Sequence, residues 1–286
     1  MSKEIDRILA RLEQLLPAPP PATDWAASVA YRWRRGGGGK SGGQGWLQPV
    51  RHVHRMRLSD LRGIDAQIAK VEQNTRQFLE GRPANNVLLT GARGTGKSSI
   101  VKGLLHKYQN KGLRLNEVEK SDLVDLPSIV DAVAGRGERF LVFCDDLSFH
   151  GAEEGYIALK VALDGSISTT SENMLIYATS NRRHLMPEYM AENLETKYVG
   201  DEIHPGETVE EKISLSERFG LWVSFYPFDQ DEYLEILEHW LDVFGIKKAS
   251  EAKEEALQWS LQRGSRSGRV AYQFARDWAG RHSKKK

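Results

Sequence analysis

The chain has 286 residues, which is enough for one or two domains with a sizeable core. Its 40 Lys and Arg residues nearly balance 39 Asp and Glu residues, so the net charge of +1 indicates no class of partner. The single cysteine, Cys144, excludes an intrachain disulfide, and there is no long apolar run to cross a membrane. Since no secretory leader is present either, we expect a cytoplasmic protein without membrane contacts.

The first 16 residues predict an amphipathic helix, because Ile5, Leu9, Leu12 and Leu16 fall on one helical face. This helix either packs on its own domain or binds a partner or a second subunit. Pro17 ends it, and we expect residues 17–57 to form a linker rich in Pro, Gly and basic residues.

The predicted linker carries strong positive charge, with seven Lys and Arg residues and no acid between positions 31 and 57. Arginines interleaved with Tyr31 and Trp33 can neutralise phosphates and stack on bases, which makes nucleic acid a candidate partner. A solvated connector is the alternative. Residues 182–211 form a long polar segment that is acidic from position 188, and it is either a partner-docking insert or a solvated loop.

A phosphate-binding motif occupies residues 91–98, which fit G-x-x-x-x-G-K-[ST] at every fixed position. The apolar residues 86–90 predict a strand before it, and the spacing of apolar residues over 99–108 predicts a helix after it. In that context the loop turns its N–H groups toward phosphates at a helix N-terminus. The predicted phosphate contacts come from Gly91, Ala92, Arg93, Gly94, Thr95, Gly96, Lys97, Ser98 and Ser99. Lys97 would reach the β- and γ-phosphates, and Ser98 would also ligate Mg²⁺.

Polar side chains follow two further predicted strands. The strand at 140–144 ends at Asp145 and Asp146, and the strand at 174–179 is followed by Asn181. Because the carboxyl ends of parallel strands open on the same crevice, these side chains should meet the phosphates. We expect Asp145 to hold Mg²⁺, Asp146 to polarise the attacking water, and Asn181 to contact that water or the γ-phosphate. Ordinary turns are the alternative for both places.

Strands alternate with helices over residues 58–228, which predicts an α/β fold: a three-layer αβα parallel sheet. Residues 229–286 show only helical periodicity and predict a small helical lid domain. Arg218, just before the last predicted strand, is a candidate finger toward a neighbouring subunit's nucleotide. Arg269 opens the last lid helix and is a candidate contact to the γ-phosphate. A surface ion pair is the alternative for each arginine.

Taken together, these motifs resemble the AAA+ ATPases, from residues 58–63 before the first strand, through the phosphate loop, to Arg269. More narrowly, residues 83–86 and 145–149 resemble a bacterial family of AAA+ ATP-binding proteins catalogued as a domain of unknown function. The resemblance implies ATP and Mg²⁺ as cofactors and a homo-oligomer with sites at subunit interfaces. It also implies ATP hydrolysis that remodels or loads an unknown protein partner.

The chain departs from that family in two informative places. Asp146 stands where AAA+ proteins usually carry Glu, so hydrolysis is expected to be slow or dependent on a partner. Residues 116–121 lack the aromatic–hydrophobic–glycine loop of AAA+ translocases, which argues against a protein-threading unfoldase. An ATP-dependent binding switch with little hydrolysis therefore remains an alternative, and a small-molecule kinase is a weaker one. A GTPase is disfavoured, because residues 110–113 lack the aspartate that would read guanine.

Overall fold

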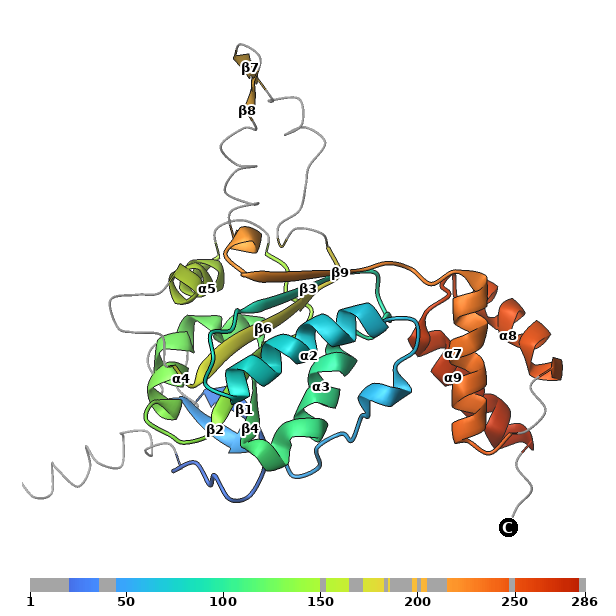
Figure 1. Cartoon of the computed structure of the whole chain (residues 1–286), viewed down its shortest axis with the longest axis horizontal. Helices are drawn as coiled ribbons and strands as arrows, with labels where there is room; N and C mark the ends of the chain where they lie inside the picture. The colour runs from blue at the N-terminus through green and yellow to red at the C-terminus, as the bar shows by residue number, and fades with distance from the viewer. Residues whose placement is uncertain are drawn as a thin grey trace, which may run out of the picture.

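A seven-stranded sheet forms the centre of the fold (Figure 1). The computed structural model describes residues 21–35, 45–149, 153–164, 172–182, 185, 197–199, 202–204, 215–246 and 250–282. The strand order is β2-β1-β4-β5-β6-β3-β9, and neighbouring strands are parallel except for the antiparallel pair β1 and β2. The strands are β1 (Ala30–Arg35), β2 (Gly45–Pro49), β3 (Val87–Gly91), β4 (Leu113–Glu117), β5 (Arg139–Cys144), β6 (Met174–Ser180) and β9 (Leu221–Phe225).

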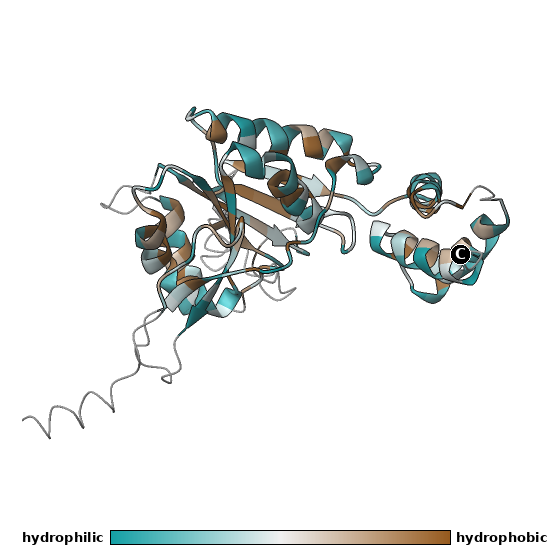
Figure 2. Cartoon of the chain, turned by 90° about the horizontal axis from the view of Figure 1, so that it is seen from below, coloured by the Kyte–Doolittle hydropathy of each residue, from teal (hydrophilic) through white to brown (hydrophobic). Residues whose placement is uncertain are grey.

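Helices cover both faces of the sheet, which is why β5 and β6 are almost entirely apolar and buried. Helices α2 (Asp65–Leu79) and α3 (Lys97–Tyr108) share one core with inward residues such as Leu89 and Phe143. Helices α4 (Leu126–Val133) and α5 (Glu154–Asp164) share the other core with residues such as Leu88 and Val142. Figure 2 shows the hydrophobic residues gathered on the sheet between these layers. The predicted αβα fold class is therefore confirmed.

A separate group of three helices follows the last strand and lies beside the sheet (Figure 1). These helices, called the lid here, are α7 (Gln230–Val243), α8 (Ser250–Gln262) and α9 (Gly268–His282). Asp229 and Glu232 form a reciprocal capping box that fixes the start of α7. Short 3₁₀ turns complete the regular elements: η1 (Leu58–Asp60), η2 (Gln109–Lys111) and η3 (Lys120–Asp125). No helix in the described parts of the chain is long and apolar enough to cross a membrane.

The expectation of a linker over residues 17–57 is wrong where β1 and β2 extend the sheet. The physical reason is a period-two pattern: Tyr31 and Trp33 are buried, and the arginines between and after them point outward. Those arginines are neutralised, since Arg32 pairs with Glu117, Arg34 with Glu119, and Arg35 with Asp122 and Asp125. Residues 31–35 are thus a strand paired on both sides, with β2 and with β4, rather than a free basic stretch.

Other predicted segments fall partly or wholly outside the described residues. The amphipathic helix at 1–16 lies outside them. Of the polar segment at 182–211, the structure describes residues 182 and 185 and a small antiparallel pair, β7 (Lys197–Val199) and β8 (Glu202–His204).

A buried hydrogen-bond network holds the start of β3 against α2 and β6. The Asn74 amide donates to the Asn85 carbonyl at 2.9 Å and to the Tyr177 hydroxyl at 3.1 Å, and it accepts from the Asn85 N–H at 2.9 Å. Asn86 accepts from the Ile176 N–H at 2.8 Å. This network explains the Asn-Asn pair before the phosphate loop, because buried polar groups must be satisfied.

Replacing Asn74 with alanine is expected to lower the free energy of unfolding by about 2–3 kcal/mol, because the Asn85 N–H and carbonyl lose their partner and the Tyr177 hydroxyl keeps only Thr75. Chemical denaturation monitored by circular dichroism measures this. Gln73→Ala, at the exposed neighbouring position, is the control, with an expected change within about 0.5 kcal/mol. Equal stability of the two variants would contradict the network's role.

Candidate functional site

The phosphate loop connects β3 to α3 and needs glycine at its last turn. Gly96 has a φ of 100° and lies at the start of α3, which begins at Lys97. A Cβ atom there would come within 2.9 Å of the Ile64 side chain. The left-handed backbone and the close packing together exclude other residues. The loop therefore places the N-terminus of α3 at the carboxyl edge of the sheet, where an anion is favoured.

The Lys97 ammonium lies inside this loop. It donates to the carbonyl oxygens of Gly91 at 2.8 Å and Ala92 at 2.7 Å, and to the Asn181 side-chain oxygen at 3.1 Å. Burial lowers the pKa of Lys97 to about 8, although Asp145 and Asp146 oppose the shift. An anion beside Lys97 would stabilise its charged form. The structure thus places a partly desolvated cation where the sequence predicted a phosphate contact.

Ser98 and Asp145, the two predicted Mg²⁺ ligands, are in direct contact. The Ser98 hydroxyl donates to Asp145 Oδ1 at 2.5 Å. Thr179, on β6, donates to the same oxygen at 2.6 Å and accepts from the Asp146 N–H at 2.9 Å. The sequence analysis missed Thr179, although its position near the end of β6, two residues before Asn181, was a usable signal. Its buried hydroxyl fixes both aspartates relative to β6.

Asp146 has an unusual backbone and a fixed side chain. With a φ of 52°, it is the only non-glycine residue with positive φ in the described part of the chain. The Asn181 amide donates to Asp146 Oδ1. Because Asn181 also accepts from Lys97, it joins the phosphate loop to the end of β5. Aspartate tolerates the left-handed region better than glutamate, since its short side chain can hydrogen-bond locally. This provides a local physical reason for aspartate at this position.

A cavity of about 720 Å³ lies between the sheet and the lid, which is a normal size for a small-molecule site. One end is polar and contains residues 93–99, Asp145, Asp146 and Asn181. The rest of the lining combines residues 54–64 with the lid; it includes Arg55, Asp60 and Arg62, and its apolar part is called the apolar end here. Its apolar side chains are Met56, Leu61, Ile64, Phe228, Ile236, Trp240 and Tyr272. The sequence analysis missed this apolar end, because helically spaced aromatic residues in α7 and α9 are equally typical of a helical core.

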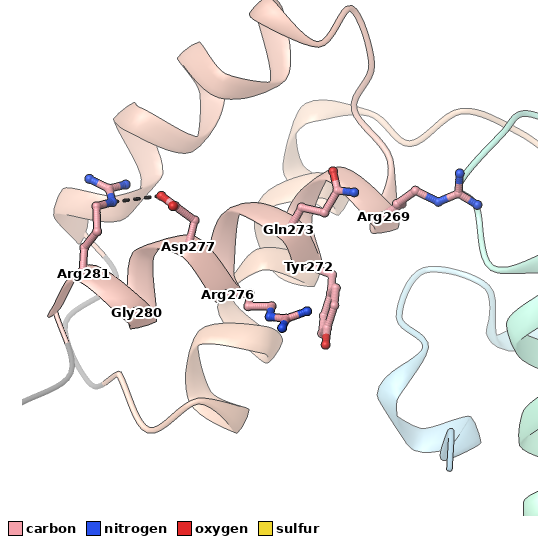
Figure 3. Close-up of a pocket in the computed structure, with 7 residues that line it drawn as sticks. All are labelled: Arg269, Tyr272, Gln273, Arg276, Asp277, Gly280 and Arg281. Carbon is pink, nitrogen blue, oxygen red and sulfur yellow. Dashed lines mark hydrogen bonds and ion pairs between the residues drawn. The ribbon is translucent and has the colours of Figure 1, made fainter. Parts of the chain in front are cut away.

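The lid contacts the phosphate loop directly. The Arg269 N–H donates to the Gly94 carbonyl at 3.3 Å. A Cβ atom at Gly94 would lie 2.7 Å from the Ser267 hydroxyl, so only glycine allows this approach. Figure 3 shows the Arg269 side chain extending from α9 toward the core domain, and this residue lines the cavity. The predicted lid arginine is therefore close to the predicted phosphate contacts.

Arg218 lies outside this cluster. It forms an ion pair with Asp164 on α5 and is not among the residues that line the cavity. A role for Arg218 at a neighbouring subunit's nucleotide stays a prediction.

An open hollow of about 680 Å³ runs along α9 and shares Arg269 and Tyr272 with the cavity (Figure 3). All seven of its residues come from this one helix, and the others are Gln273, Arg276, Asp277, Gly280 and Arg281. It is an exposed helix face rather than an enclosed site.

Residues 26–282 match the family described as "Protein of unknown function (DUF815)". No curated protein matches the chain. Among solved structures, the FIGL-1 AAA domain in complex with ADP matches with a TM-score of 0.53 and 16% identity, over 80% of this chain and 74% of that one. A mutant of RuvB from Thermotoga maritima matches with a TM-score of 0.51 and 15% identity, over 78% of this chain. This chain spans 64% of that RuvB chain, which is less than two thirds. These likenesses show an AAA+ type of fold.

Proposed function

This chain belongs to the DUF815 family, and we propose that it is an ATP-binding protein and ATPase whose nucleotide-driven lid movement remodels or loads a partner. The observation that carries the proposal is the convergence of six side chains on one cavity. Lys97, the pair of Ser98 and Asp145, the pair of Asp146 and Asn181, and Arg269 all line it. They come from α3, the ends of β5 and β6, and the lid. A simple glycine turn would not require this assembly.

ATP is the ligand that suits both ends of the cavity. Lys97 would exchange the carbonyl oxygens of Gly91 and Ala92 for the β- and γ-phosphates, which are stronger acceptors. The apolar end between residues 54–64 and the lid would hold the base. The similar FIGL-1 AAA domain was crystallised in complex with ADP, which supports an adenine nucleotide here.

The Ser98 hydroxyl and the Asp145 carboxylate fit Mg²⁺, because both are hard oxygen donors already in contact. No group of three or more His, Cys, Asp or Glu side chains suited to a metal occurs among the described residues. Mg²⁺ does not need such a group, because it usually binds one or two protein side chains together with phosphates and waters. When bound, Mg²⁺ would neutralise developing charge on the phosphates.

Hydrolysis needs a carboxylate to orient water, and Asp146 is the candidate. In its present arrangement, one Asp146 oxygen accepts from Asn181. A γ-phosphate that attracts Lys97 away from Asn181 would weaken the contact between Asn181 and Asp146. The side chains of Asp146 and Asn181 could then both position the water. Arg218 of a neighbouring copy in a homo-oligomer would supply the remaining positive charge.

The contact between the lid and the phosphate loop would convert nucleotide binding into movement of α9. Arg269 responds to the γ-phosphate by charge, and the close packing of Gly94 on Ser267 passes any movement of the loop to α9. The partner that this movement remodels is a protein of unknown identity. Nucleic acid, the other candidate, would use Arg51, Arg55 and Arg57, because Arg32, Arg34 and Arg35 are paired with acids.

A binding switch with little hydrolysis is the second candidate function. The observation that favours it is the fixed, left-handed Asp146, whose side chain is one methylene shorter than glutamate and tied to Asn181. In that case ATP would hold the lid in one position without fast turnover.

Lys97→Ala is expected to weaken ATP binding by roughly 100-fold or more, because a charge-assisted contact to the phosphates is lost. Isothermal titration calorimetry with ATP and Mg²⁺ measures the affinity. Lys70→Ala, an exposed change on α2, is the control and should leave the affinity unchanged. Wild-type protein that gives no heat with adenine nucleotides would refute the proposal.

The affinity for ATP is expected to fall as pH rises above about 8, where free Lys97 begins to lose its proton. The sign follows from linkage: phosphate stabilises the protonated form, so binding above this pH takes up a proton. Titrations between about pH 7 and 9.5 measure the effect. Lys97→Arg, whose charge is permanent, should flatten the profile. A flat wild-type profile would contradict the assigned role of Lys97.

Asp146→Asn is expected to reduce ATP hydrolysis by about 100-fold while leaving ATP binding intact, since asparagine also tolerates the left-handed backbone. Phosphate release measures turnover, and Asp131→Asn on the exposed side of α4 is the control. Unchanged turnover in Asp146→Asn would favour the binding switch or a different base.

A further inference from the structure

The segment at residues 51–57 carries positive charge that the rest of the described chain does not compensate. It contains Arg51, Arg55 and Arg57, two histidines and no acid, and all three arginines are exposed. None of the three forms an ion pair in the described structure. The arginines of β1, only a short distance earlier in the sequence, all pair with acids. The contrast indicates that the positive charge of residues 51–57 can bind a negatively charged group outside the described fold.

More uncompensated charge lies on the lid, which lines the same cavity as residues 54–56 of this segment. Arg55 and Arg269 both line the nucleotide cavity, and Arg269 and Arg276 share the exposed face of α9. Figure 3 shows Arg276 and Tyr272 projecting on the side of α9 that faces the pale blue ribbon preceding α2. We call Arg51, Arg55, Arg57, Arg269 and Arg276 the basic rim.

Bound nucleotide would not cancel this charge. Six Lys and Arg residues but only three aspartates line the cavity itself. Mg²⁺ would already neutralise part of the triphosphate charge. Arg51, Arg57 and Arg276 lie beyond the cavity lining and add to the surplus. The basic rim therefore attracts a second, larger anion.

The same chain contains a segment of opposite charge. Residues 188–211 hold eight Asp and Glu residues and one Lys. No basic-rim arginine forms an ion pair with an acid of the described structure. Figure 1 shows β7 and β8, which belong to this segment, standing out beyond α5 and β9, whereas the lid lies at the other end of β9. Within one molecule β7 and β8 therefore lie away from the lid.

We propose that the acidic segment 188–211 of one copy docks on the basic rim of a second copy. The contact is heterologous, so repeating it closes a ring or extends a chain. Arg218 lies in the same connection between β6 and β9 as the acidic segment. Docking would therefore bring the neighbour's Arg218 region toward the cavity mouth. This inference rests on the homo-oligomer of the proposed function and names the surfaces that form it. The contact itself does not require bound nucleotide.

The test is a charge swap, measured by sedimentation velocity without nucleotide, over a range of protein and salt concentrations. The wild type is expected to self-associate at low salt and to dissociate at high salt, because exposed charges are screened. Reversing the rim (Arg51→Glu, Arg55→Glu, Arg57→Glu) or the segment (Glu207→Lys, Glu210→Lys, Glu211→Lys) should raise the dissociation constant by roughly tenfold or more.

Mixing the two reversed variants should restore association, because each then offers the surface that the other needs. Lys70→Glu with Lys111→Glu reverses charge on the α2–α3 layer and should leave association unchanged. If the reversed rim does not fold, as judged by circular dichroism, Arg51→Gln, Arg55→Gln and Arg57→Gln should still weaken association.

A wild type that stays monomeric at low salt would overturn the proposal, and so would a mixture that fails to reassociate. A third outcome is that the wild type binds single-stranded DNA with steep salt dependence, while mixing the reversed variants restores no association. That result would show that the basic rim binds nucleic acid rather than the acidic segment. ATP binding is measured separately by calorimetry, so a failure here leaves the nucleotide site untouched.

Discussion

The structure depends on two hydrogen-bond chains that connect the phosphate loop to the ends of neighbouring strands. One runs from Ser98 through Asp145 to Thr179, and the other from Lys97 through Asn181 to Asp146. They form because β6 lies between β5 and β3 in a parallel sheet, so all three carboxyl ends open on one edge. A loop with the phosphate-binding pattern is thereby joined to the two carboxylates at the end of β5. The proposed ATPase begins from that junction.

The lid turns this junction into an enclosed site. Its α9 begins against Gly94, and α7 contributes Ile236 and Trp240 to the apolar end of the cavity. The cavity thus combines charged groups with apolar side chains, a combination that suits the proposed adenine nucleotide. Because the lid touches the loop itself, a change in the loop reaches α9 through direct packing rather than through a long path.

Charge has two different uses along the chain. In β1 the arginines pair with acids between Glu117 and Asp125 and hold this strand beside β4 and η3. The basic-rim arginines have no such partners among the described residues, and two of them, Arg55 and Arg269, line the cavity. Since compensated pairs at the surface contribute little to binding, only the second group provides long-range attraction. The net charge of +1 conceals this division.

The sequence alone determined the alternating strands and helices and the loop from Gly91 to Ser98, because these depend on local periodicity and fixed spacing. It also indicated Asp145, Asp146 and Asn181, since polar residues after buried strands lie at one edge. Only the tertiary structure decided that residues 31–35 form a strand of the sheet, because the alternation of Tyr31 and Trp33 was hidden among arginines whose acidic partners are distant in sequence. The role of Thr179, the left-handed Asp146 and the apolar end of the cavity likewise came from the structure. Each of these depends on which segments meet in space, which no local pattern encodes.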